Sequence, residues 1–103
     1  MKRIIEGKTY NTATAEEVAT FRDGTPSDWR HVEEALYVTK KGAWFLAGAG
    51  GPMSGYAVSC GNNSWSGGSG IHPLSRTDAL AWLERNDETD VIEEYFAEFI
   101  VEA

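Results

Sequence analysis

Residues 34–51 of the chain have the sequence EALYVTKKGAWFLAGAGG, which is typical of a β-hairpin. Before the turn, Leu36 and Val38 fall on one face, as the two-residue period of a strand requires. The turn ends at Gly42, which can adopt a positive φ. The strand after the turn is apolar on both faces, so we expect it in the centre of a sheet. The sequence therefore predicts a small antiparallel sheet built on a central hairpin at residues 31–47.

After the hairpin, residues 48–70 contain eight of the eleven glycines, interspersed with aromatic residues. This pattern favours a folded loop that packs on the sheet, and long loops of this kind often carry function. The start of the loop lacks the third glycine of a dinucleotide-binding loop, because Met53 stands there, and it lacks the ending of a P-loop. A stacking platform for a base or a sugar could be formed by Trp29, Trp44, Tyr56 and Trp65. Four tryptophans in so small a domain are more often core residues.

An N-terminal helix is predicted for residues 12–22. Thr14 and Glu17 have the spacing of a capping box, in which each side chain bonds the backbone N–H of the other residue. Val18 and Phe21 then fall on one helical face. The same residues therefore predict both the start of a helix and its buried side.

Two more helices are predicted near the C-terminus. Ser75 is a favoured N-cap for a helix at residues 76–85. Residues 90–101 carry apolar side chains at helical spacing, although residues 97–102 would also fit a closing strand. These elements predict a single α+β domain, residues 1–103, in which about three helices pack on the sheet.

The charge of the chain is concentrated at one end. The formal net charge is −7, yet residues 1–83 contain eight acids and eight bases. Residues 84–103 contain eight acids and only one base, Arg85. Direct binding to nucleic acid is not expected, because neutralising phosphates needs clustered Lys and Arg. The longest apolar run is too short to span a bilayer.

The acidic residues of the last predicted helix are the best candidates for a functional site. Asp90, Glu94, Glu98 and Glu102 recur at every fourth position, and four residues of an α-helix advance about 6 Å. Such a row would approximate the spacing of backbone phosphates and would bind a basic groove meant for nucleic acid. A solvated helix face that keeps the protein in solution would give the same pattern. The residues predicted to bind a partner are Asp87, Asp90, Glu93, Glu94, Glu98, Glu102, Trp65 and Tyr56.

Cys60 and His72 are the candidates for a nucleophile and its base. The only other histidine is His31, and the spacing matches no protease signature. We expect a buried structural cysteine and a surface histidine instead, and we predict no catalytic residue, cofactor or metal ligand. A single cysteine excludes an internal disulfide and is compatible with the cytoplasm.

Three segments resemble a group of small, mostly uncharacterised bacterial proteins carried on phages, plasmids and integrative elements. They are KRIIEGKTYNTATA at residues 2–15, LYVTKKGAWFL at residues 36–46 and IHPLS at residues 71–75. The resemblance extends from Lys2 to about Tyr95. Small acidic proteins of such elements are often inhibitors of host defence, including anti-CRISPR proteins, so the resemblance implies an anti-defence role.

The leading hypothesis is a non-enzymatic accessory protein of a mobile element that inhibits a host nucleic-acid-handling defence complex, such as a CRISPR effector. It would act in the bacterial cytoplasm through its acidic C-terminal face. One alternative is a small-ligand or nucleotide-binding protein, or an enzyme, that uses the loop at residues 48–70. The other is a self-associating module, in which Phe96, Phe99 and Ile100 would form the seam of a homodimer.

Overall fold

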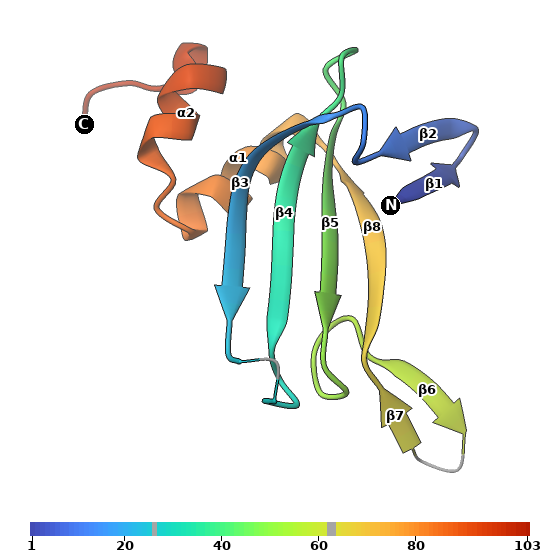
Figure 1. The fold of residues 1–103 in the computed structure, drawn as a ribbon. Helices are drawn as coiled ribbons and strands as arrows, with labels where there is room; N and C mark the ends of the chain where they lie inside the picture. The colour runs from blue at the N-terminus through green and yellow to red at the C-terminus, as the bar shows by residue number, and fades with distance from the viewer. Residues whose placement is uncertain (26, 62–63) are drawn as a thin grey trace.

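The structure is a computed structural model that describes residues 1–25, 27–61 and 64–103. Its centre is a four-stranded antiparallel sheet with the strand order β3-β4-β5-β8 (Figure 1). These strands are β3 (Glu16–Asp23), β4 (Val32–Val38), β5 (Trp44–Gly50) and β8 (Gly68–Leu74). The other strands form two separate hairpins, β1 (Lys2–Ile5) with β2 (Lys8–Asn11) and β6 (Val58–Gly61) with β7 (Ser64–Ser66).

The chain is richer in strand and poorer in helix than its sequence predicted. Strands account for 44% of the described residues and helices for 20%. The helical elements are α1 (Arg76–Arg85), α2 (Thr89–Tyr95) and the single 3-10 turn η1 (Ala97–Phe99). The predicted fold with about three helices is therefore wrong, because residues 16–23 form a strand and the last helix ends early. No helix in the described part of the chain is long and apolar enough to cross a membrane.

The hairpin predicted at residues 31–47 forms the middle of the sheet. Leu36 lies opposite Leu46 in the β4–β5 register, and Gly42 in the turn has a φ of 87°. Strand β8 pairs with β5 along its whole length. The central position expected for β5 from its two apolar faces is confirmed.

Strand β3 was predicted as a helix because a β-bulge hides its alternation. Its register with β4 shifts between Glu17 and Ala19, so that Val18 and Ala19 both pack against the core. After this doubling, Val18 and Phe21 have the spacing of one helical face. Pairing with β4 therefore decides the structure of a segment whose local pattern is ambiguous.

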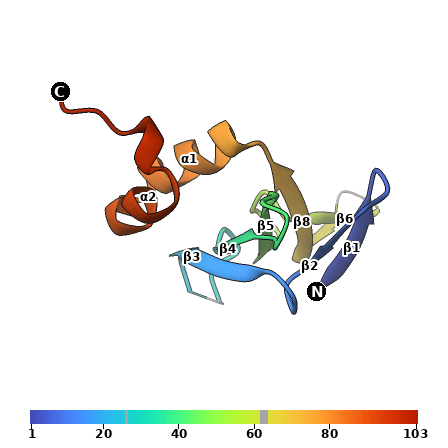
Figure 2. The same cartoon turned by 90° about the horizontal axis from the view of Figure 1, so that it is seen from above.

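One face of the sheet is covered by the helices (Figure 2). Helix α1 begins after Ser75, whose side chain accepts a hydrogen bond from the backbone N–H of Asp78 at 3.0 Å. This N-cap and the helix that follows it are confirmed. The core of this face consists of seven buried residues, Leu36, Trp44, Leu46, Ala79, Trp82, Leu83 and Phe96.

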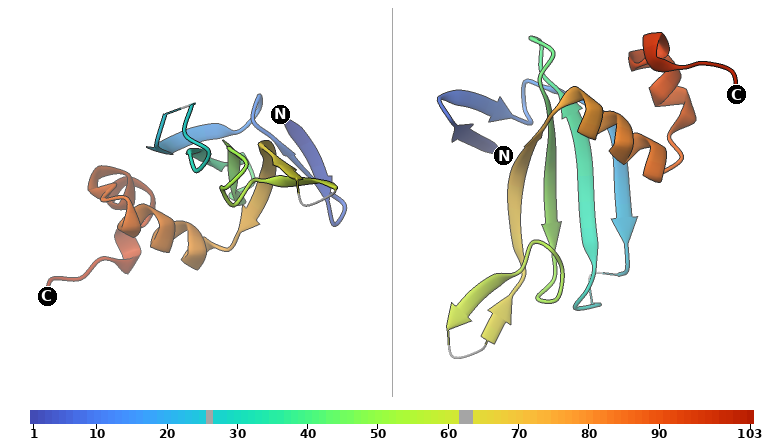
Figure 3. Two further views of the ribbon diagram at one scale, coloured as in Figure 1. Left: turned by 90° about the horizontal axis from the view of Figure 1, so that it is seen from below. Right: turned by 180° about the vertical axis from the view of Figure 1, so that it is seen from behind.

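The opposite face carries the β1–β2 hairpin. Tyr10 packs with Phe45 and Ile71 in a second core, and the Tyr10 and Phe45 rings meet edge to face with centroids 5.5 Å apart. Because its side chains alternate, β5 supplies residues to both cores. The molecule is elongated, 51 × 34 × 19 Å, with α2 and the β6–β7 hairpin at opposite ends (Figure 3).

Candidate functional site

The C-terminal acids lie on the surface around α2 and η1, and we refer to residues 84–102 as the acidic lobe. Seven of its eight carboxylates belong to exposed residues: Glu84, Asp87, Asp90, Glu93, Glu94, Glu98 and Glu102. Helix α2 has only seven residues. The predicted row of four acids on one helix is therefore wrong, since only Asp90 and Glu94 of that row share α2.

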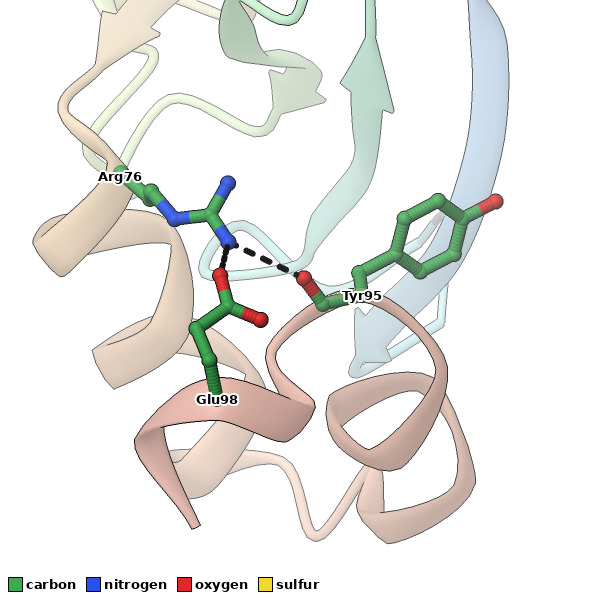
Figure 4. A network of polar contacts seen from close by, with 3 residues as sticks. All are labelled: Arg76, Tyr95 and Glu98. Carbon is green, nitrogen blue, oxygen red and sulfur yellow. Dashed lines mark hydrogen bonds and ion pairs between the residues drawn. The ribbon is translucent and has the colours of Figure 1, made fainter.

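Arg76 at the start of α1 organises the end of α2 (Figure 4). Its Nη2 donates a hydrogen bond to the carbonyl oxygen of Tyr95 at 3.3 Å and forms an ion pair with Glu98. The guanidinium also lies 4.8 Å from the ring centroid of Phe96 and 5.2 Å from that of Phe99. Glu98 is thus paired within the chain, and it is a weaker candidate for partner binding than its sequence position indicated.

The carboxylate of Glu16, at the start of β3, lies close to Tyr95 of the acidic lobe. Tyr95 packs edge to face on Trp44, with ring centroids 5.6 Å apart. Its burial, together with the nearby carboxylates of Glu16 and Glu94, raises the pKa of Tyr95 to about 12. Glu16 was not predicted as a site residue, because it reaches this surface only when its segment forms a strand of the sheet.

The apolar stripe of the last predicted helix is divided between core and surface. Phe96 is fully buried, with its ring centroid 5.0 Å from that of Trp44. It is therefore unavailable for the predicted dimer seam. Phe99, by contrast, is 55% exposed, and Ile100 and Val101 are exposed beside it. Glu98 and Glu102 flank these residues in the sequence, and exposed apolar side chains among carboxylates have the composition of an interface with an apolar centre and a polar rim.

The two aromatic residues predicted to share this surface lie elsewhere. Tyr56 is only 8% exposed, and its hydroxyl donates to the carboxylate of Glu34 at 2.5 Å. Burial and this bond raise the pKa of Tyr56 well above its usual range. Trp65 is 58% exposed, but it belongs to β7 at the end of the molecule opposite α2 (Figure 3). The predicted partner-binding residues therefore do not form one surface.

The glycine-rich segment at residues 48–70, of which residues 62 and 63 lie outside the described residues, packs on the sheet only in part. Its two ends belong to β5 and β8 and Tyr56 is buried, but β6 and β7 form an exposed hairpin, so the prediction of a loop folded onto the sheet is only partly confirmed. A β-carbon at Gly48 would overlap the hydroxyl of Tyr56, so this glycine lets the Tyr56 ring cross β5. The space above Gly48 is thus filled by the chain itself. The described part of this segment therefore gives no support to a phosphate cradle.

Cys60 and His72 belong to different sheets, and no hydrogen bond joins them in the part of the chain that the structure describes. Cys60 is exposed in β6, so the prediction of a buried cysteine is wrong. His72 is exposed, as predicted, and the centroid of its ring lies 5.3 Å from the centroid of the Tyr56 ring. Within residues 1–25, 27–61 and 64–103, no group of three or more His, Cys, Asp or Glu is placed to hold a metal ion.

The four tryptophans are divided evenly between core and surface. Trp44 and Trp82 are buried in the core between the sheet and the helices, as expected of tryptophans in a small domain. Trp29 is 67% exposed, and its carbonyl oxygen accepts a hydrogen bond from the backbone N–H of Met53 at 2.7 Å. The exposure of Trp65 agrees with its prediction as a partner-binding residue, whereas that of Trp29 was not singled out, because it depends on which loops the sheet leaves uncovered.

Comparison with known proteins gives no family for the chain. No family model, curated protein or solved structure matches it. The resemblance to proteins of mobile elements therefore remains an expectation from sequence motifs. The function has to be argued from the surfaces of the molecule itself.

Proposed function

We propose that this protein is a non-enzymatic accessory protein of a mobile element, which inhibits a host nucleic-acid-handling defence complex in the bacterial cytoplasm. The observation that supports the proposal most is the exposed, largely unpaired charge of the acidic lobe. Of its eight carboxylates, only that of Glu98 forms an ion pair among the described residues. The lobe therefore presents negative charge that is not neutralised within the chain.

The binding surface of this proposal is a compact acidic patch with an apolar centre. Unpaired carboxylates attract a groove lined by Lys and Arg, accelerate the encounter and make it sensitive to salt. Phe99 and Ile100 would supply close-range burial, at about 25 cal/mol per Å² of apolar surface removed from water. A defence complex that holds nucleic acid offers the basic groove that such a patch would occupy.

The alternatives differ in the residues they require. A ligand site in the glycine-rich segment has less support, because Tyr56 fills the space over Gly48. Self-association through Phe99 and Ile100 uses the same exposed side chains as the main proposal. Sedimentation at high protein concentration separates these cases, because a monomer would exclude the homodimer.

The proposal is tested by displacement of labelled DNA from purified defence effectors, including CRISPR effector complexes. The informative variant is Asp90→Lys with Glu94→Lys, because both residues are exposed and neither forms an ion pair in the described part of the chain. Glu6→Lys with Asp23→Lys is the matched control, since it makes the same charge change outside the lobe. We expect the wild type to displace DNA from at least one effector, less well as salt rises from about 50 to 200 mM.

The two variants then separate a specific surface from net charge. We expect the lobe variant to lose about tenfold or more in displacement and the control variant to remain close to the wild type. Equal losses in both variants would show that total charge matters and not the lobe. Wild-type activity in the lobe variant, or no displacement from any effector, would refute the proposal. Thermal unfolding of both variants checks that each remains folded.

A further inference from the structure

A cavity lined by basic residues lies on the face of the sheet opposite α1 and α2. It is a cavity of about 650 Å³ between the β1–β2 hairpin and the β4–β5 turn, on the side that Figure 2 shows away from the helices. This volume falls within the usual range of small-molecule sites. Its lining includes Lys8, Lys40 and Lys41 and no acidic residue. Three of the nine bases of a chain with net charge −7 thus surround one cavity.

Packing of the N-terminal hairpin brings these lysines together. Lys8 is two residues from Tyr10 on β2, so the two side chains leave the strand on the same face. Tyr10 packs on Phe45, and this contact turns the Lys8 face of the hairpin toward the sheet. The other two lysines occupy a turn held by Thr39, whose side-chain oxygen accepts a hydrogen bond from the backbone N–H of Ala43 at 3.0 Å. Both walls of the cavity are therefore anchored in the fold.

The cavity offers positive charge and hydrogen-bond donors. The ion pairs found in the described chain are Arg22–Glu33 and Arg76–Glu98, so none of the three lysines has a carboxylate partner there. The side-chain oxygen of Asn11, another lining residue, accepts a hydrogen bond from the backbone N–H of Ala13, which leaves its amide N–H groups as donors. Like charges around one hollow repel each other, and a bound anion would relieve that repulsion.

We propose that this cavity binds a small anion with two or three linked phosphates, such as a nucleoside di- or triphosphate. Lysine ammonium groups bind phosphate as point charges, and three of them balance most of the charge of such a group. The one aromatic side chain of the lining, Tyr10, is buried against Phe45, so recognition rests on the phosphates and not on base stacking. A long nucleic acid is disfavoured, because its phosphates outside the cavity would meet a chain of net negative charge.

Calorimetric titration with sodium tripolyphosphate tests the proposal on the full chain. The variant Lys8→Gln, Lys40→Gln, Lys41→Gln removes the three charges of the cavity. The control variant Lys2→Gln, Arg30→Gln, Arg85→Gln removes three charges from exposed residues that do not line it. We expect saturable binding by the wild type, a loss of about tenfold or more in the cavity variant, and affinity within about twofold of the wild type in the control.

Three results would overturn the proposal. The first is the absence of a saturable heat of binding in the wild type. The second is an equal loss of affinity in both variants, which would indicate diffuse attraction. The third is tighter binding per phosphate of a single-stranded oligonucleotide than of tripolyphosphate through the same lysines, which would identify a nucleic-acid site instead. Hydrogen exchange gives an independent measure. A ligand that joins the two walls should slow exchange in β2 and in the β4–β5 turn, and should leave α2 unchanged. The outcome does not depend on the acidic lobe.

Discussion

Arg76 contacts a carbonyl oxygen, a carboxylate and two aromatic rings with one guanidinium group (Figure 4). These contacts differ in strength. The side chains of Arg76 and Glu98 are 46% and 60% exposed, and exposed ion pairs contribute about 0–1 kcal/mol. The planar guanidinium can contact the rings of both Phe96 and Phe99 while one of its N–H groups reaches the carbonyl of Tyr95 at the end of α2. The shape of the guanidinium therefore matters more here than its pairing with Glu98.

We predict that Arg76→Ala lowers the free energy of unfolding by about 2 kcal/mol, because the carbonyl bond and both cation–π contacts are lost. Glu98→Gln should cost less than about 1 kcal/mol. Arg76→Lys keeps the charge and should still lose most of the stabilisation. Urea denaturation of the three variants measures these differences. A Glu98→Gln variant as unstable as Arg76→Ala would show that the ion pair is the main interaction.

At the scale of elements, helix α2 depends on a residue outside it. The helix has seven residues, no side-chain N-cap bond and no buried residue of its own. A helix of that length is not stable alone in water. Phe96, which follows it directly, is fully buried against Trp44. We infer that this ring is the main attachment of α2 to the sheet, beside the partly buried side chains of Val91, Ile92 and Tyr95.

We predict that Phe96→Ala costs about 3–5 kcal/mol, the usual effect of removing a buried phenyl ring, and releases α2. Hydrogen exchange should become fast at residues 89–99, whereas β4 and β5 should keep their protection. Phe99→Ala is the control, because the Phe99 side chain is largely exposed and its loss should change stability by about 0.5 kcal/mol. Continued protection of α2 in Phe96→Ala would mean that other contacts hold it.

The elements that were predicted correctly are those with local causes. The β4–β5 hairpin follows from alternation and from a glycine turn, and α1 follows from the Ser75 cap. Strand β3 was missed because its bulge at residues 17–19 imitates helical spacing. The end of α2 was missed because Arg76, at the start of α1, holds it from outside the helix. Neither cause is visible in a short window of sequence.

The candidate sites also differ in whether local sequence or the folded chain brings their residues together. The acidic lobe was predicted because its residues follow one another in the chain. Glu16 lies near it only because its segment forms the strand that the sequence did not predict. Tyr56 does not belong to it, because its hydroxyl end packs over Gly48 of β5. The lysine cavity was missed because Lys8 and Lys40 meet only after the N-terminal hairpin folds back on the sheet.

At the scale of the whole molecule, the sheet separates two regions of opposite charge. The acidic lobe lies with the helices on one side, and the β1–β2 hairpin lies on the other (Figure 2). Residues of that hairpin line the lysine cavity. Because the two sites share no residue, a protein partner and a phosphate ligand could be bound together. Occupation of the cavity by an anion would also make the net charge more negative than −7 and would strengthen long-range attraction to a basic partner.

The whole molecule should lose stability at high pH through three of its tyrosines. Burial, then the charge of Glu17 and the hydrogen bond to it, raises the pKa of Tyr37. The pKa values of Tyr56 and Tyr95 are also raised, chiefly by burial. In the unfolded chain these hydroxyls ionise at about pH 10. The folded chain therefore binds more protons than the unfolded chain above that pH, so stability is complete below about pH 10 and is lost as the pH rises toward the folded-state values.

We predict that the urea midpoint falls steeply between about pH 10 and 12, and that tyrosinate absorbance appears together with unfolding. Tyr95→Phe should flatten this fall, because a phenyl ring has no proton to release, and it should change stability little at neutral pH. High salt separates the tyrosines from general repulsion, since screening weakens the repulsion among surface carboxylates and does not change the removal of the tyrosine hydroxyls from water. The contrary result would be a wild-type dependence on pH in both Tyr56→Phe and Tyr95→Phe that high salt abolishes. Repulsion among the surface carboxylates, and not ionisation of the tyrosines, would then cause the loss of stability at high pH.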